Sequence, residues 1–323
     1  MFLKRCSILV LSSVLAFGCG TAPCLAAEQI RPTGVTTPFA DDDSDAPPKA
    51  KAVTRKKKPA KRAPKAARAE EDVSLGTLPN GVPVTKAKSV LVIDAHTGQT
   101  LYEKNPDEYR AAASTQKLLT ALIVAERGYL DQQVTVQFVD TLAEPVKLNI
   151  KPGDTYQRID LLRALLVKSP NDVARCLARD YAGSIEAFAD VMNRRAQQLG
   201  ATHSHFVNPN GLPIPGQYST ARDLSLIARA AYANATIRSI VCMPQYVFRF
   251  ANGRTRELEN TNKVLRRLPA CNGMKTGYTE AAGHCLISSA TKPGRDVIAV
   301  VLGDSKAGIW RDSAALLTWA LAM

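Results

Sequence analysis

Ser114 and Lys117 stand three residues apart at the start of an apolar segment, residues 113–127, and their side chains could form a nucleophile with its own base. On an α-helix this spacing places both side chains on one face, one above the other. The positive end of the helix would also stabilise an oxyanion that forms beside the serine. A serine at a helix start is commonly only an N-cap, and Ser-x-x-Lys also occurs by chance. The pair therefore indicates acyl-transfer chemistry only if the rest of the chain supplies partners.

Two further short patterns are candidates for these partners. Ser169 and Asn171 flank a proline that follows the apolar run 161–167, and because proline ends a helix we expect both on a turn that can face a cleft. Lys-Thr-Gly at residues 275–277 lies on a predicted edge-like strand. Alone, these patterns are a helix cap and a charged turn. In the order Ser-x-x-Lys, Ser-x-Asn and Lys-Thr-Gly, they are the set found in penicillin-recognising serine acyl-transferases.

On these residues the chain resembles the serine D-alanyl-D-alanine carboxypeptidases, the low-molecular-mass penicillin-binding proteins. The likeness extends over about residues 89–303, because four more segments are similar to sequences of that family: 206–213 (its Asn…Gly-Leu-Pro loop), 218–223 (Tyr-Ser-Thr-Ala-Arg-Asp), 260–263 and 277–283. The chain departs from the family at Ala112, where proline is usual, and at Pro170, where a small residue is commoner. Neither departure removes a reacting atom.

The resemblance implies a role for each catalytic residue. Ser114 would attack the carbonyl between two D-alanines and carry the acyl group, without a cofactor. Lys117 would be the base, which requires a lowered pKa, and both burial and the nearby cation of Lys275 favour that shift. Ser169 would relay a proton to the leaving amine, and Asn171 would hold an amide of the substrate.

The same resemblance implies how the substrate is held. Lys275 and Thr276 would grip its terminal carboxylate, and Gly277 would let its backbone approach the strand. The backbone N–H groups of the nucleophilic serine and of Tyr278 would form the oxyanion hole. Arg222 would brace the strand of Lys275 or help to fix the carboxylate.

Other activities fit parts of the pattern. Cleavage of D-alanyl cross-links by an endopeptidase stays open beside removal of the terminal D-alanine, which we favour. A class A β-lactamase shares the three patterns, but it needs a glutamate, and an asparagine four residues later, between the second and third of them. Residues 206–213 contain no glutamate, and Glu186 is followed four residues on by Asp190 inside a helical pattern. A catalytically inactive wall-binding scaffold is the last alternative, and the intact patterns argue against it.

The first 75 residues differ in composition from the rest. Lys4 and Arg5 precede a short apolar run and small residues, which predicts a secretory signal over residues 1–27 and export to the periplasm or cell envelope. Within residues 28–75, four aspartates lie in 41–45, and residues 49–68 then carry ten Lys or Arg and no acid, which accounts for much of the net charge of +13. Such a segment has little to bury, so we expect a disordered linker.

The predicted partners follow from this organisation. The substrate would be a peptidoglycan stem peptide that ends in D-Ala-D-Ala, and β-lactam antibiotics would acylate the same serine. The basic segment would bind anionic wall polymer or membrane surface, or act as a spacer without a partner of its own. Nucleic acid is the least favoured partner, because only this segment suggests it.

Residues 76–323 form one predicted catalytic domain, long enough for a sizeable core. Strand patterns at 90–94 and 100–103 predict a hairpin. We expect further strands at 246–250, 283–290 and 297–302, and helices at 114–127, 158–167, 171–181, 184–199, 224–232 and 310–321. Strands at both ends with helices between them predict an α/β fold of the α+β type. The resemblance makes this a β-lactamase/transpeptidase-like sandwich, with a mainly antiparallel sheet covered by helices on both sides.

Four cysteines follow the predicted signal: Cys176, Cys242, Cys271 and Cys285. Cys176 lies in an apolar helical pattern and is expected to be a small buried hydrophobe. The pairing of the others stays open. The four histidines show no metal-ligand spacing, so we predict no metal site.

Overall fold

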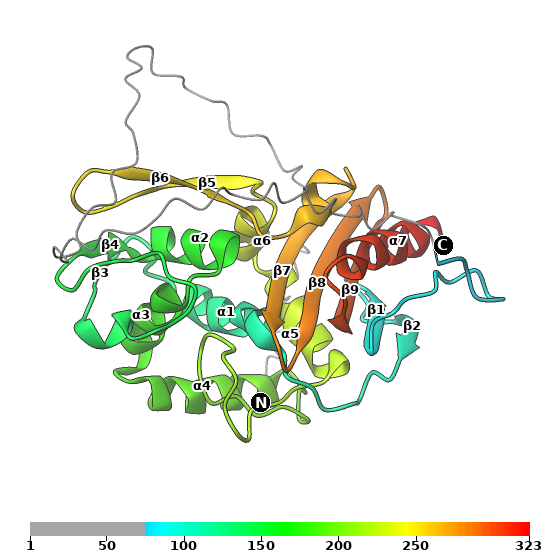
Figure 1. Ribbon diagram of the computed structural model, residues 1–323, viewed down its shortest axis with the longest axis horizontal. Helices are drawn as coiled ribbons and strands as arrows, with labels where there is room; N and C mark the ends of the chain where they lie inside the picture. The colour runs from blue at the N-terminus through cyan, green and yellow to red at the C-terminus, as the bar shows by residue number, and fades with distance from the viewer. Residues whose placement is uncertain (1–74) are drawn as a thin grey trace, which may run out of the picture. The chain divides into compact units, whose positions relative to one another are not determined.

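The computed structural model describes residues 75–323 (Figure 1). The predicted signal, residues 1–27, lies outside the described residues, and so does all of the predicted linker except its last residue. None of the described helices is both long enough and apolar enough to cross a bilayer.

A five-stranded antiparallel sheet forms the centre of the described chain, with strand order β2-β1-β9-β8-β7. The predicted hairpin is present, because β1 (Ser89–Asp94) pairs with β2 (Thr100–Lys104). β9 (Arg295–Asp304) lies between β1 and β8 (Gly283–Lys292), and β7 (Cys271–Thr279) forms one edge. Strands from both ends of the domain thus share one sheet, as the sequence predicted.

Side chains of the sheet alternate between two hydrophobic cores. Val297 and Ala299 of β9 pack in the smaller core with α7 (Gly308–Ala322), whereas Ile298 and Val300 pack in the larger core with the other helices. A period of two is expected of a strand whose two faces are both buried. Figure 1 shows α7 on one face and the remaining helices on the opposite side. The prediction of a sheet covered by helices on both sides is confirmed.

Helices α1 to α6 supply most of the larger core. They are α1 (Lys117–Arg127), α2 (Arg158–Lys168), α3 (Asn171–Ala182), α4 (Ile185–Gln198), α5 (Ala221–Ala233) and α6 (Ala235–Val241), and the short 3-10 helices η2 (Phe138–Thr141) and η3 (Lys263–Arg266) lie in connecting segments. Side-chain caps fix three of the starts, because Ser184 accepts the N–H of Ala187, Thr220 accepts that of Asp223 and Asn234 accepts that of Ile237. The sequence predicted α1 to α5, but α6 has only 7 residues and is too short for a clear periodic signal.

Two small sheets complete the described fold. β3 (Gln133–Thr135) pairs with β4 (Thr155–Gln157), and β5 (Gln245–Arg249) pairs with β6 (Thr255–Glu259). The predicted strand at 246–250 therefore exists, but it pairs outside the main sheet. The other three strands are short or largely exposed, so they lack the apolar pattern that would have predicted them.

Three cysteines are buried free thiols: Cys176, Cys271 and Cys285. Cys176 packs in the larger core, as expected of a small hydrophobe. Burial raises the pKa of the Cys271 and Cys285 thiols to about 11, so both are protonated at neutral pH.

The larger core can be tested at Ile287, which is fully buried on β8 and pairs with Lys275 of β7. We expect Ile287→Ala to lower the free energy of unfolding by about 2–5 kcal/mol, because apolar burial is lost and a cavity is left. The control is Val247→Ala on β5, where the side chain is 55% exposed and we expect a change within about 0.5 kcal/mol. Urea unfolding measures both, and equal losses would contradict this assignment of the core.

Candidate active site

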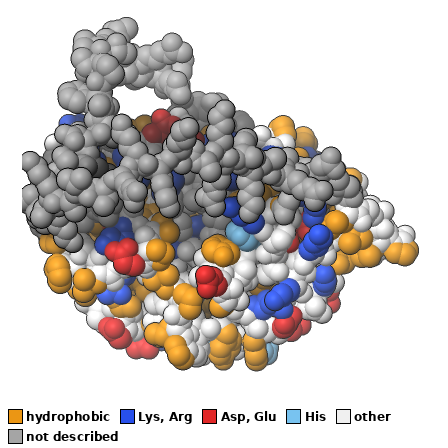
Figure 2. All heavy atoms as spheres, viewed as in Figure 1, with side chains coloured by type: hydrophobic (Ala, Val, Ile, Leu, Met, Phe, Trp, Pro, Cys, Tyr) orange, Lys and Arg blue, Asp and Glu red, His pale blue; other side chains and the backbone are white. Residues whose placement is uncertain are grey.

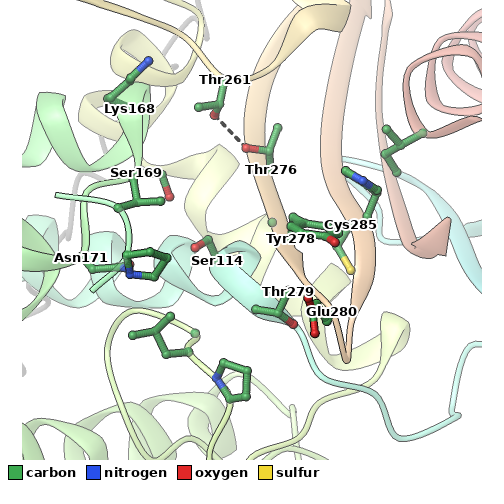
Figure 3. Close-up of a pocket in the computed structure, with 18 of the residues that line it drawn as sticks. Ser114, Lys168, Ser169, Asn171, Thr261, Thr276, Tyr278, Thr279, Glu280 and Cys285 are labelled. Atoms are coloured by element: carbon green, nitrogen blue, oxygen red, sulfur yellow. Dashed lines mark hydrogen bonds between the residues drawn. The ribbon is translucent and has the colours of Figure 1, made fainter. Parts of the chain in front are cut away.

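A pocket of about 550 Å³ opens beside the edge strand β7 and is lined by residues from all three sequence patterns. Figure 3 shows its walls: the turn that carries Ser114, the junction of α2 and α3 with Ser169 and Asn171, and β7 with Thr276. Segments far apart in the sequence therefore meet at one cleft. Its volume lies in the range of small-molecule and peptide sites.

Ser114 lies on a 3-10 turn, η1 (Ala113–Gln116), that leads directly into α1. Side chains at i and i+3 eclipse in such a turn, so it aligns Lys117 with the serine more closely than the predicted α-helix would. Lys117 Nζ is 2.7 Å from Ser114 Oγ. It is also 2.8 Å from Asn171 Oδ1 and 2.7 Å from the carbonyl oxygen of Asn210. Lys117 is fully buried among these three oxygens.

Burial is the largest influence on the Lys117 amine and lowers its pKa well below the ordinary value. The cation of Lys275 lowers that pKa further, and the Asp172 carboxylate opposes the shift. A neutral amine fits the observed contacts, because it can accept the hydroxyl proton of Ser114 and donate to the two remaining oxygens. The pair therefore has the geometry of a serine nucleophile with an attached base.

Ser169 and Asn171 face this pair from the junction of α2 and α3. Ser169 caps the C-terminus of α2 in the left-handed region at φ 67°, which is uncommon for a residue other than glycine. Its buried Oγ has no hydrogen-bond partner among the described residues, so the hydroxyl is available to a ligand. Asp172, next to Asn171, accepts the backbone N–H groups of Leu148 and Asn149 at 2.9 and 2.8 Å and anchors that loop.

The β7 wall carries the third pattern. Lys275 is buried and donates to the carbonyl of Thr276 at 3.0 Å, and burial lowers the pKa of its amine to about 7. The hydroxyl of Thr276 donates to that of Thr261 at 2.7 Å. A Cβ on Gly277 would lie 2.9 Å from the backbone nitrogen of Ser114. The glycine thus lets the turn that carries Ser114 approach β7 closely. The sequence analysis had expected only the substrate backbone to approach at this glycine.

A loop at residues 208–212 completes the site, and sequence reasoning gave it no role. Its Asn210 carbonyl is the third of the oxygens within hydrogen-bond distance of the buried amine. The Asn208 side chain shapes the loop by accepting the N–H of Gly211 at 2.8 Å. Gly211 has φ +82°, and a Cβ there would overlap the carbonyl of Ala113. The Asn…Gly-Leu-Pro resemblance marked this loop, but a functional backbone carbonyl leaves no signature in residue type.

Arg222 does not lie at the pocket, which corrects the expectation that it braces β7 or fixes a carboxylate. Its Nε is 2.7 Å from Asp107 Oδ1 and its Nη2 is 3.1 Å from Glu103 Oε2, so its charge is paired elsewhere. Tyr278 does line the pocket, and its ring stacks on His284 with centroids 4.4 Å apart.

The fold and the buried Ser114–Lys117 pair have the arrangement expected of a serine hydrolase in which a lysine is the base. Residues 78–306 match the D-alanyl-D-alanine carboxypeptidase family, and the chain belongs to that family.

Comparison with known proteins gives the extent of the similarity. The chain is 37% identical over 262 residues to a D-alanyl-D-alanine carboxypeptidase of Mycobacterium tuberculosis, covering 79% of this chain and 89% of that protein. A D-alanyl-D-alanine endopeptidase of Escherichia coli is 32% identical over 242 residues, with 73% and 78% covered. The crystal structure of a Mycobacterium tuberculosis D-alanyl-D-alanine carboxypeptidase has a TM-score of 0.72 at 35% identity, covering 77% of this chain and 96% of that one. The chain spans only 58% and 64% of longer carboxypeptidases from Bacillus subtilis and Escherichia coli.

The loop at 208–212 can be tested at Gly211. We expect Gly211→Ala to slow acylation by benzylpenicillin on the order of 100-fold, because the clash with Ala113 displaces the Asn210 carbonyl from the amine. Gly216→Ala is the matched control, since Gly216 has φ +83° and a Cβ added there would have nothing within 4 Å. It should cost only the strain of a positive φ, about 1–2 kcal/mol of stability, and leave acylation unchanged. Equal acylation rates in the two variants would contradict this role of the loop.

The two buried amines predict the pH dependence of peptide hydrolysis. Both kcat and kcat/KM should rise with pH as Lys117 loses its proton. This rise should be complete well below the ordinary pKa of a lysine. In the free enzyme, kcat/KM should fall as pH passes about 7, where Lys275 becomes neutral and attracts a carboxylate less. A bound carboxylate raises the pKa of Lys275, so kcat should fall only at higher pH. If kcat and kcat/KM fell at the same pH, Lys275 would not be the group that meets the carboxylate.

Proposed function

We propose that this chain is a serine D-alanyl-D-alanine carboxypeptidase of peptidoglycan, which removes the terminal D-alanine of a stem pentapeptide through an acyl-serine intermediate. One observation carries the proposal: the buried Lys117 amine lies 2.7 Å from the Ser114 hydroxyl, at a pocket on the edge of β7. Membership of the D-alanyl-D-alanine carboxypeptidase family supports the choice of substrate.

The geometry supports the following acylation step. Ser114 Oγ bonds to the carbonyl carbon between the two D-alanines, and its proton passes to the neutral Lys117 amine. The oxyanion accepts hydrogen bonds from the backbone N–H groups of Ser114 and Tyr278. The C–N bond then breaks, and the leaving amine takes a proton by way of Ser169, whose Oγ has no other partner among the described residues.

Hydrolysis of the acyl-serine reverses these roles. A water molecule adds to the ester carbonyl and gives a proton to the Lys117 amine, and the ester bond breaks as Ser114 Oγ regains a proton. The products are the shortened stem peptide, with a free carboxyl group, and D-alanine. Asn171 and the Asn210 carbonyl hold Lys117 in place through both steps, because each lies within 2.8 Å of its Nζ.

Endopeptidase activity on cross-links is the second candidate, because one similar relative is named a D-alanyl-D-alanine endopeptidase. The reacting amide is the same in both reactions, and only the leaving group differs in size. A β-lactamase is disfavoured, because residues 206–213 contain no glutamate and meet Ser114 and Lys117 through the backbone carbonyl of Asn210.

The proposal includes export to the periplasm or cell envelope, on the evidence of the signal-like residues 1–27. The basic stretch 49–68 would then lie near anionic wall polymer and membrane surface, which are more suitable partners there than nucleic acid.

Intact-mass spectrometry with benzylpenicillin tests the proposal, beside release of D-alanine from a stem pentapeptide and from a cross-linked dimer. We expect one lasting penicilloyl adduct on the full chain, none on Ser114→Ala, and faster D-alanine release than dimer cleavage. Preferential cleavage of the dimer would favour the endopeptidase. Destruction of the drug without an adduct would indicate a β-lactamase, and an unreacted drug would contradict the enzymatic interpretation.

A further inference from the structure

The pocket carries opposite charges at its two ends. Lys168 lines one end together with the hydroxyl-bearing Thr261 and Thr276, and Glu280 lines the other end beside Thr279. In Figure 3 the first three lie above Ser114 and the last two lie below it. A substrate with one charged end therefore meets an asymmetric field along β7.

Lys168 is the last residue of α2 and directly precedes Ser169. Its side chain is half-buried, and within residues 75–323 its ammonium makes no ion pair or hydrogen bond. The ammonium of a lysine in the last turn of a helix interacts favourably with the negative end of the helix dipole, which explains why a lysine is stable at this position. It does not explain why Lys168 lines the pocket. In Figure 3 its side chain extends upward from the α2 wall, so that the amine lies beyond Thr276 as seen from Ser114.

Three other cations of the described residues have contacts of their own. Lys275 is buried, donates to the Thr276 carbonyl, and has its pKa lowered to about 7 by burial. Arg222 pairs with acidic residues outside the pocket, and the Lys263 ammonium lies 5.6 Å from the ring centre of Trp310. Among the described residues that line the pocket there is no arginine. Lys168 is thus the one lysine among the described residues that line the pocket, and it adds to the charge of the buried Lys275.

We infer that Lys168 is a specificity-determining residue, which binds the terminal carboxylate of the substrate together with the hydroxyl groups of Thr261 and Thr276. This inference rests on the proposed function and deepens it. It requires the substrate to lie along β7 with its carboxylate toward Lys168 and its N-terminal side toward Glu280. The reverse orientation would bring the carboxylate to the acidic end of the cleft.

Charge is not confined to the pocket. Figure 2 shows several Lys and Arg side chains on the right of this face, over the region that β8, β9 and α7 occupy in Figure 1. Such charges attract any anion to the surface, whether or not it binds in the cleft. The test therefore needs a control lysine near the pocket but outside its wall. Lys306 serves, because it is exposed and its charge acts on the pocket-lining His284.

The experiment compares the hydrolysis of diacetyl-L-Lys-D-Ala-D-Ala with that of the same peptide as its C-terminal amide, using the full chain. We expect Lys168→Gln to raise KM for the acid on the order of 10- to 100-fold, the range for a lost hydrogen bond to a charged group. It should leave kcat nearly unchanged and leave the amide unaffected. The effect on the acid should be larger above a pH of about 7, where Lys275 is neutral. Lys168→Arg should restore most of the binding, and Lys306→Gln should match the wild type.

A second pair of probes keeps the test decisive if the amide reacts slowly. Acylation by benzylpenicillin and by its methyl ester is followed by intact mass, and only the free acid should react more slowly with Lys168→Gln. Equal losses on the charged and neutral probes would mean that Lys168 acts through the fold, and no loss on either would also overturn the inference. Thermal melting of each variant identifies a folding defect. A wild type that is neither acylated nor releases D-alanine would instead contradict the proposed function itself.

Discussion

The structure around the site depends on one constraint, the burial of the Lys117 amine. An ammonium without partners is costly in an apolar interior, so the amine must lose its charge or be surrounded by acceptors. Here both occur: burial lowers its pKa, and three oxygens lie within hydrogen-bond distance of Nζ. Those oxygens come from η1, from the start of α3 and from the loop at 208–212. The contacts of the proposed base therefore form only when three separate parts of the chain meet correctly.

Two of the three lysines around the cleft are buried and Lys168 is half-buried, and the tasks that we propose for them differ accordingly. Lys117 and Lys275 are both buried, and the positive charge on Lys275 helps to keep Lys117 neutral. A further buried cation would add desolvation cost, and a carboxylate brought deep into the site would raise the pKa of Lys117, the proposed base. A cation at the half-buried rim, such as Lys168, can attract a substrate carboxylate without either effect. The arrangement separates the charge that recognises substrate from the amine that takes its proton.

The sequence marked side chains that the structure brings together at the pocket, because residue type and spacing identify a serine, a lysine or an amide. It also predicted the main sheet and α1 to α5, since their apolar periods are long. It could not find the Asn210 carbonyl, because every residue has a carbonyl and only the fold selects one. Arg222 was misplaced for a related reason: its partners, Asp107 and Glu103, are more than a hundred residues away in sequence. Lys168 looked like an ordinary lysine at a helix end until the structure placed it in the pocket wall.

The edge position of β7 explains why the substrate needs charge to orient it. One side of β7 is unpaired in the main sheet, so an extended peptide can add to it through backbone hydrogen bonds. Backbone groups are similar in either direction along a strand, and Gly277 offers no side chain to distinguish them. Only one direction places the scissile carbonyl at Ser114 with a carboxylate beside Thr276. The unlike charges of Lys168 and Glu280 at the two ends of the cleft provide the difference in energy between those directions.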